Sequence, residues 1–76
     1  MQTITIKNLI LHTLPDATVI VEGDGSHFTA TVVSECFINQ SRIQRQQRVY
    51  EAVKKELLDG TLHALSLKTF TPAEYQ

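Results

Sequence analysis

The sequence predicts a small α+β domain whose elements follow in the order helix, strand, strand, helix, strand and short helix. Three observations support this class. Apolar residues recur at helical spacing near the N-terminus and again in the middle of the chain. Two short runs rich in β-branched residues flank a glycine-bearing turn, which is typical of a hairpin. A third short apolar run follows the longer helical segment and precedes a helix start that contains proline.

The length and composition limit the classes of protein to which this chain can belong. A chain of 76 residues forms one domain, residues 1–76, near the lower size limit for an apolar core that lacks covalent or metal staples. Hydrophobic residues make up 42% of the chain and charged residues 20%, as in ordinary globular proteins. The lone Cys36 rules out an intramolecular disulfide and favours a reducing compartment. We expect a cytoplasmic protein without membrane contact, because no apolar run approaches the roughly 20 residues that cross a bilayer.

The N-terminal half is expected to form a helix followed by a hairpin. Residues 3–14 carry apolar side chains at helical spacing, and Thr3 is a suitable N-cap. Residues 17–22 form a short β-branched run, and the turn at 23–26 supplies residues that tolerate a positive φ. The return strand is expected over residues 28–35, where apolar and polar side chains alternate.

The longest helix is expected in the second half of the chain. Residues 37–41 form a loop, Ser41 caps a helix over residues 42–58, and Gly60 stops that helix. At about 100° per residue, one face of the helix collects the side chains predicted to pack on the core. These are Ile43, Tyr50, Val53 and Leu57, with Val49 beside them.

A third strand and a short helix complete the chain. Residues 62–68 have the length and composition of a strand. Thr71 then offers a cap and Pro72 takes the first helical position, where a missing N–H costs nothing. The second strand, the long helix and the third strand thus form a crossover, which normally makes its two strands parallel and right-handed.

Two histidines occupy the starts of these strands. If the two strands are neighbours, His27 and His63 lie at the same edge of the sheet, because parallel strands begin at the same side. Adjacent strands are about 4.8 Å apart, so both imidazoles are within reach of one metal centre. Neutral imidazole is a good ligand for iron. Two ligands do not complete a coordination sphere, so the remaining donors must come from a partner.

Each histidine also has a simpler interpretation. His63 suits a partly buried strand histidine bonded to a backbone carbonyl, and His27 alone suits an exposed loop position. Cys36 is expected to be a small buried hydrophobe and is rejected as a third ligand, because it lies near the far end of the second strand. His12, in the first helix, carries no predicted role.

A basic segment at the start of the long helix offers a different function. Arg42, Arg45 and Arg48 are residue types that contact nucleic acid, although a solvated helix start explains them equally well. The formal net charge of −1 argues against strong non-specific binding, and no aromatic series suited to base stacking accompanies the arginines. No Ser-His-Asp, HExxH or dinucleotide-binding motif is present, so we expect no enzymatic activity.

The sequence resembles the BolA-like family over nearly its whole length, in three blocks with matching order and spacing. The Gln46-Gln47 pair looks like the IbaG-like bacterial subgroup, whereas many other members carry His-Arg there. The blocks are Gly23-Asp24-Gly25-Ser26-His27-Phe28, then Ser41-Arg42-Ile43 through Arg45-Gln46-Gln47-Arg48-Val49-Tyr50, and Leu62-His63-Ala64-Leu65-Ser66-Leu67 to Thr71-Pro72-Ala73-Glu74-Tyr75.

The resemblance implies a fold, a partner and a cofactor. It implies a three-stranded mixed sheet similar to the type II KH module. It also implies a monothiol glutaredoxin as partner, with a [2Fe-2S] cluster shared between the two proteins in iron-sulfur trafficking, iron homeostasis and stress response. His63 corresponds to the cluster ligand of the third strand and His27 to the second candidate, while the glutaredoxin cysteine and a glutathione thiol supply the other ligands. We expect partner contacts around Arg45, Gln46, Arg48, Thr71 and Pro72.

Two alternatives remain open at this point. Some BolA relatives are described as KH-like nucleic-acid-binding transcriptional regulators, which would use Arg42, Arg45 and Arg48. The GxxG loop with which KH modules clamp nucleotides is absent from this sequence, which disfavours that mode of binding. A plain adaptor that binds glutaredoxin without a cluster is the other alternative. The free protein is expected to be a monomer or a weak homodimer.

Overall fold

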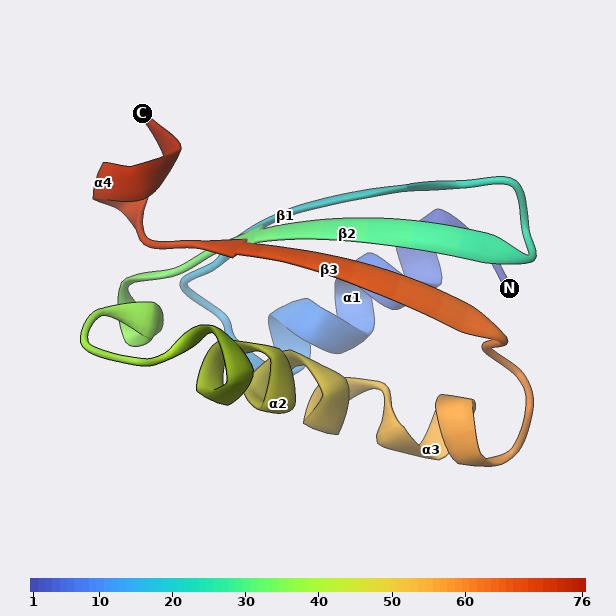
Figure 1. The fold of residues 1–76 in the computed structure, drawn as a ribbon. Coiled ribbons are helices and arrows are strands. Elements are labelled where there is room, and N and C mark those ends of the chain that lie inside the picture. Colours follow the sequence, from blue (N-terminus) through green and yellow to red (C-terminus); the bar gives the residue numbers. More distant parts are fainter.

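The structure is a computed structural model that describes all 76 residues. Its elements confirm the predicted α+β class (Figure 1). They are α1 (Thr3–Thr13), β1 (Thr18–Gly23), β2 (His27–Val33), a 3-10 turn η1 (Glu35–Phe37), α2 (Arg42–Ala52), α3 (Lys54–Leu58), β3 (Ala64–Phe70) and α4 (Pro72–Tyr75). No helix is long and apolar enough to cross a membrane.

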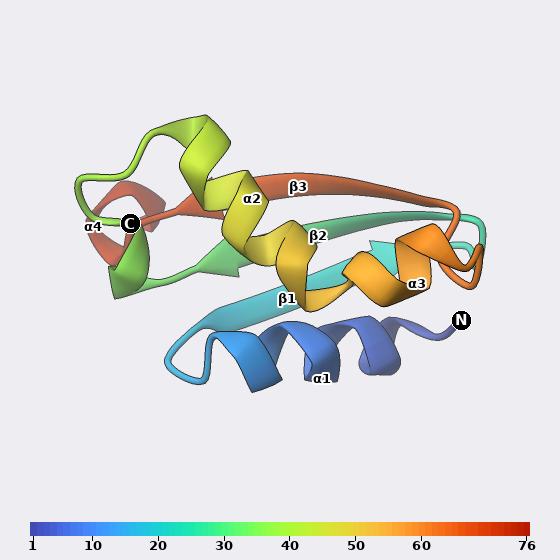
Figure 2. The same cartoon turned by 90° about the horizontal axis from the view of Figure 1, so that it is seen from below.

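The strands form one mixed sheet in the order β1-β2-β3. β1 and β2 are antiparallel, and β2 and β3 are parallel, as expected for a hairpin followed by a crossover. The register places the buried Phe28 opposite the buried Leu65, and Val19 opposite Val32. Helices α1, α2 and α3 cover this apolar face, while α4 lies on the opposite side at one end (Figures 1 and 2).

The core lies between the sheet and the three helices that cover it. Its side chains come from every strand, from α1 and α2, and from the connecting segments. Fully buried Phe37 in η1 closes the end of the core nearest α4. The buried cluster is Ile6, Ile10, Leu14, Val19, Phe28, Ala30, Val32, Phe37, Val49, Val53, Leu62, Leu65 and Leu67.

The segment predicted as one helix, residues 42–58, is not continuous, so that prediction is wrong. It breaks at Val53, where φ is −120° and ψ is 15°, and α3 leaves in a different direction (Figure 2). Val53 is fully buried, so the chain keeps this side chain in the core at the expense of a continuous helix. β-branched residues tolerate this readily because their helix propensity is low.

Other predicted boundaries also shift. The return strand expected over 28–35 ends at Val33, because Ser34 caps η1 by accepting a hydrogen bond from the Cys36 N–H. The third strand begins at Ala64 and not at residue 62. Ile43, predicted on the core face, is 68% exposed because the first turn of α2 extends past the edge of the sheet (Figure 2).

Two of the three predicted helix caps are confirmed. Ser41 accepts a hydrogen bond from the Gln44 N–H, and the Gln44 side chain accepts one from the Ser41 N–H. Thr71 and Glu74 form the same reciprocal box at α4, with proline at its first position. Thr3 is wrong as a cap, because α1 already begins there and no side chain caps its start.

Arg45 ties α4 to the rest of the fold. Its guanidinium donates to both carboxylate oxygens of Glu74, at 2.7 and 3.3 Å, and its Nε donates to the Gln40 carbonyl at 3.0 Å. The same group lies 5.9 Å from the centre of the Phe37 ring. Only 13% of the Arg45 side chain is exposed. We call these four residues, Phe37, Gln40, Arg45 and Glu74, the Arg45 clamp.

A pair of identical substitutions in α1 tests the core. Ile10→Val removes a methylene from a fully buried side chain and should lower the free energy of unfolding by about 1 kcal/mol. Ile4→Val makes the same change where the side chain is 52% exposed and should cost less than about 0.5 kcal/mol. Urea unfolding followed by circular dichroism measures both, and equal losses would contradict this placement of α1.

The Arg45 clamp should loosen in acid. The hydrogen bonds from Arg45 lower the pKa of Glu74 below its ordinary value of 4.5. A carboxylate with a lowered folded-state pKa stabilises the fold above its unfolded pKa, and that contribution is lost as pH falls through the folded value. Urea unfolding at neutral and acidic pH should therefore show an acid loss that is smaller in Glu74→Gln. The exposed Glu51→Gln is the control, and matching profiles for both variants would refute the clamp.

Candidate functional site

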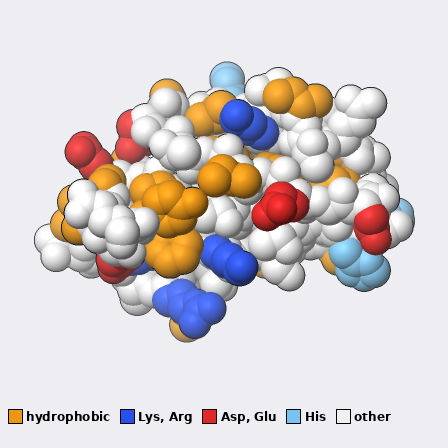
Figure 3. Space-filling view, turned by 90° about the horizontal axis from the view of Figure 1, so that it is seen from above, with side chains coloured by type: hydrophobic (Ala, Val, Ile, Leu, Met, Phe, Trp, Pro, Cys, Tyr) orange, Lys and Arg blue, Asp and Glu red, His pale blue; other side chains and the backbone are white.

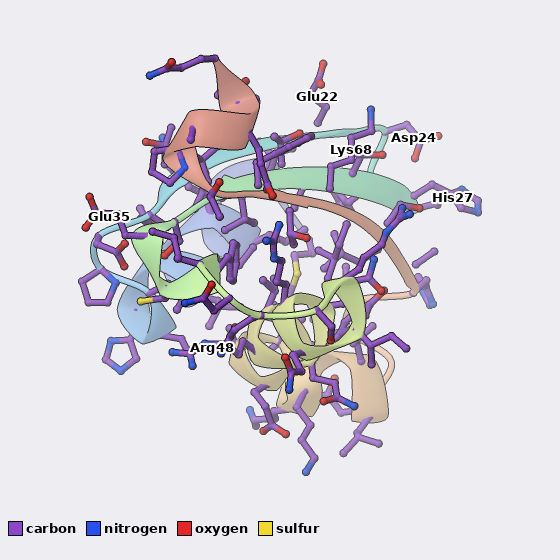
Figure 4. The ribbon with its side chains drawn as sticks, turned by 60° about the vertical axis from the view of Figure 1, so that its left-hand side comes forward. Glu22, Asp24, His27, Glu35, Arg48 and Lys68 are labelled. Atoms are coloured by element: carbon purple, nitrogen blue, oxygen red, sulfur yellow. The ribbon has the colours of Figure 1, made fainter.

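The turn between β1 and β2 holds His27 at the start of its strand. The Asp24 carboxylate accepts hydrogen bonds from the Ser26 and His27 N–H groups, each at 2.9 Å. Both bonds lower the pKa of Asp24, and the bond from the His27 N–H has the larger effect. Gly25 adopts a φ of 100°, which favours glycine. Figure 4 shows Asp24 and His27 projecting together from the end of the sheet that lies far from Glu35.

The parallel pairing of β2 and β3 brings the second histidine to the same end. His27 pairs with Ala64, so His63 lies one residue before the partner of His27. The expected adjacency of the two strand starts is confirmed. His63 itself precedes β3, so its predicted position inside the strand is wrong by one residue.

The segment before β3 keeps His63 in solvent. Gly60 adopts a φ of 83°, and Asp59 accepts a hydrogen bond from the Thr61 N–H at 2.9 Å, which together form a tight turn. The Leu62 N–H donates to the Glu56 carbonyl, and its side chain is buried in the core. His63 follows this anchor and is exposed, so the alternative of a partly buried strand histidine is wrong.

The histidine end does not complete a metal site by itself. No group of three or more His, Cys, Asp or Glu side chains is placed to hold a metal ion. Cys36 lies in η1, beyond the opposite end of β2, as expected. It is exposed and not buried as predicted, because its thiol turns outward to the Asp16 carboxylate at 3.7 Å. Ser34 donates to the other oxygen of that carboxylate, which lowers the pKa of Asp16.

The predicted partner-binding residues lie toward the other end of the molecule. Thr71 is 7% exposed, and Arg45 is held in the clamp, so both are engaged within the fold. Gln46 is half-buried, while Arg48 and Pro72 are exposed. The binding role of all five stays a prediction.

The three arginines proposed to bind nucleic acid differ in their surroundings. Arg42 and Arg48 are exposed on α2, but the Arg45 guanidinium is occupied by Glu74 and Gln40. Figure 3 shows histidine side chains at the end far from α4 and another histidine on one long side, while basic side chains lie along both long sides. The two candidate functions thus use different parts of the surface.

The sequence interpretation assigned no role to Asp24 or Lys68. Asp24 was expected only as part of the turn at 23–26, yet it fixes the backbone that presents His27. Its position two residues before Ser26 is the typical signal of such a turn. Lys68 lies on the outer strand β3 and lines one hollow together with Arg42 and Arg45 of α2, a juxtaposition that only the fold creates.

Comparisons with known proteins agree with this architecture. A family model described as BolA-like protein matches residues 6–74. Acid stress protein IbaG of Escherichia coli is 39% identical over 75 residues, which cover 99% of this chain and 89% of that protein. The DNA-binding transcriptional regulator BolA of Haemophilus influenzae is 43% identical over 54 residues, or 71% of this chain and 52% of that protein.

The solved structures show the same likeness. The structure of a BolA protein homologue from Coxiella burnetii matches with a TM-score of 0.86 and 42% sequence identity. The match covers 99% of this chain and 96% of that one. Sequence and fold therefore agree along nearly the whole length, and the chain belongs to the BolA-like protein family.

Proposed function

We propose that this protein binds a monothiol glutaredoxin and shares a [2Fe-2S] cluster with it, with His27 and His63 as its ligands. One observation carries the proposal: the parallel pairing of β2 and β3 brings both histidines to neighbouring strand starts. Family membership supports it, and the name of the E. coli relative, an acid stress protein, supports a role in the stress response. The wider role is iron-sulfur trafficking and iron homeostasis.

The donor set of the histidine end fits a shared cluster better than a resident metal. Both imidazoles are exposed, and no third ligand from this chain joins them. A [2Fe-2S] cluster needs four protein or thiol ligands, so the glutaredoxin cysteine and its glutathione would supply the thiolates. When bound, such a cluster supplies one-electron redox chemistry, and imidazole in place of thiolate raises its reduction potential.

The rest of the chain presents the two ligands. Asp24 fixes the turn that carries His27, and the buried Leu62 anchors the segment that carries His63. A partner can reach both imidazoles without any rearrangement of Asp24 or Leu62, because both histidines are exposed. Preorganisation of this kind lowers the conformational cost of binding.

The direct test uses His63→Ala with His12→Ala as the matched control. A monothiol glutaredoxin carrying a [2Fe-2S] cluster is mixed with each protein, and visible absorption and circular dichroism are recorded. His63→Ala should weaken formation of the mixed cluster at least about tenfold, because it removes a ligand. The exposed His12, in α1, should leave it unchanged. Equal effects, or spectra matching the glutaredoxin homodimer with no complex on gel filtration, would end the proposal.

A second candidate function is binding to nucleic acid. The name of the Haemophilus influenzae relative, a DNA-binding transcriptional regulator, supports it, as do exposed Arg42 and Arg48 on α2. The net charge of −1 argues against it, because affinity for nucleic acid scales with the number of phosphates neutralised. We therefore rank it second.

A salt titration tests this second candidate. If Arg42 and Arg48 contact phosphates of a labelled DNA duplex, each change to alanine should reduce the slope of log affinity against log salt by about one. Lys54→Ala, the loss of an exposed cation on α3, is the control. Arg45→Ala is unsuitable because it breaks the Arg45 clamp. Absence of binding at physiological salt would exclude this function.

A further inference from the structure

A basic hollow lies between the start of α2 and the end of β3, at the opposite end of β3 from His63. It has a volume of about 480 Å³. Only one of its lining residues is hydrophobic, and three of them carry a positive charge. The lining residues, which define the basic hollow, are Arg42, Arg45, Lys68, Thr69, Phe70 and Glu74.

The basic hollow carries two cations without an acidic partner. Arg45 and Glu74 form the one salt bridge in the structure and neutralise each other. Arg42 and Lys68 are both exposed and pair with no carboxylate. Two unpaired positive charges beside one hollow favour an anionic ligand.

The backbone of β3 offers a second kind of contact. β3 is an outer strand, and its Phe70 carbonyl accepts from the Ser34 N–H at the end of β2. Backbone direction alternates along a strand, so Leu67 and Thr69 turn their N–H and carbonyl groups away from β2. The Leu65 carbonyl also points outward, where the Tyr50 hydroxyl satisfies it at 3.0 Å. The outward groups of Leu67 and Thr69 have no such partner.

We propose that the basic hollow binds a short acidic segment of a partner protein, added to the outer edge of β3 as a further strand. Leu67 and Thr69 would exchange backbone hydrogen bonds with the segment, while Arg42 and Lys68 receive its carboxylates. Tyr50 limits the added strand to the half of β3 nearest α4. Strand addition of this kind takes its affinity from backbone bonds and its specificity from the side chains beside the edge.

The chemistry of the edge favours a peptide over a nucleic acid. A phosphate backbone has no N–H groups to satisfy the outward carbonyls of Leu67 and Thr69, whereas a peptide strand has them in register. A second copy of this chain fits poorly, because antiparallel pairing of Leu67 with Thr69 of the other copy would place Lys68 opposite Lys68 of that copy. An acidic strand satisfies both the backbone and the charges.

The inference goes beyond the proposed function and does not rest on it. Lys68 and Thr69 lie five and six residues after His63. At about 3.3 Å per residue, this separates the basic hollow from the histidines by roughly 15 to 20 Å. Loss of the cluster would leave the hollow intact, and loss of peptide binding would leave the ligands in place.

The test is a titration with a fluorescein-labelled peptide of alternating glutamate and valine, read by fluorescence anisotropy. The acidic peptide should bind at least about tenfold more tightly than a lysine and valine peptide. Arg42→Ala and Lys68→Ala should each weaken binding about two- to fivefold, as expected for exposed ion pairs. Lys55→Ala removes the same charge from α3 and should change nothing.

Backbone methylation separates strand addition from simple charge attraction. Peptides N-methylated on alternate residues lose the N–H groups of one edge only, so one pattern should abolish binding and the other should leave it unchanged. Amide hydrogen exchange provides a second readout. The Thr69 amide should become protected when the acidic peptide is bound, while the amides of β1, the other outer strand, should not.

Three outcomes would overturn the proposal. The first is equal binding of both methylated peptides, which would leave only charge attraction. The second is tighter binding of a single-stranded oligothymidylate than of the acidic peptide, with loss of that binding in Arg42→Ala and Lys68→Ala. The third is absence of Thr69 protection at saturating peptide. Each is measurable whether or not a cluster forms with glutaredoxin.

Discussion

The parallel pairing of β2 with β3 is the constraint on which the rest of the structure depends. It places the buried side chains Phe28 and Ala30 opposite Leu65 and Leu67, so the apolar faces of the two strands match. A slip of β3 by one residue would turn Leu65 and Leu67 toward solvent, which makes the register hard to change. The same register decides what lies at either end of the strand pair.

Arg45 shows how tertiary packing reassigns a residue that looks functional. In the sequence it belongs to a basic segment and is typical of a phosphate contact. In the fold it binds Glu74 and the Gln40 carbonyl and lies over Phe37, with little of its side chain exposed. Its neighbours Arg42 and Arg48 on α2 stay exposed. The clamp therefore positions α4 and leaves recognition to other cations.

Local chemistry made much of the fold predictable. Ser41 and Thr71 cap the predicted helices, and the crossover gives the expected parallel strands. The break at Val53 and the exposure of Ile43 were not predictable, because the first depends on how Val53 packs in the core and the second on where the sheet ends beneath α2. His27 and His63 could be brought together from topology alone, but the solvent position of His63 depends on the buried anchor at Leu62.

The two ends of β3 differ in what they lack. At its start, exposed imidazoles are available to a metal, but the chain adds no further ligand to them. At its end, cations and outward backbone groups are available to a strand, but the chain adds no fourth strand. A domain of this size has few residues left to cover either end of β3, because much of its chain is needed for the core. In both proposals each end is completed by another molecule, and the length of β3 keeps the two proposed sites apart.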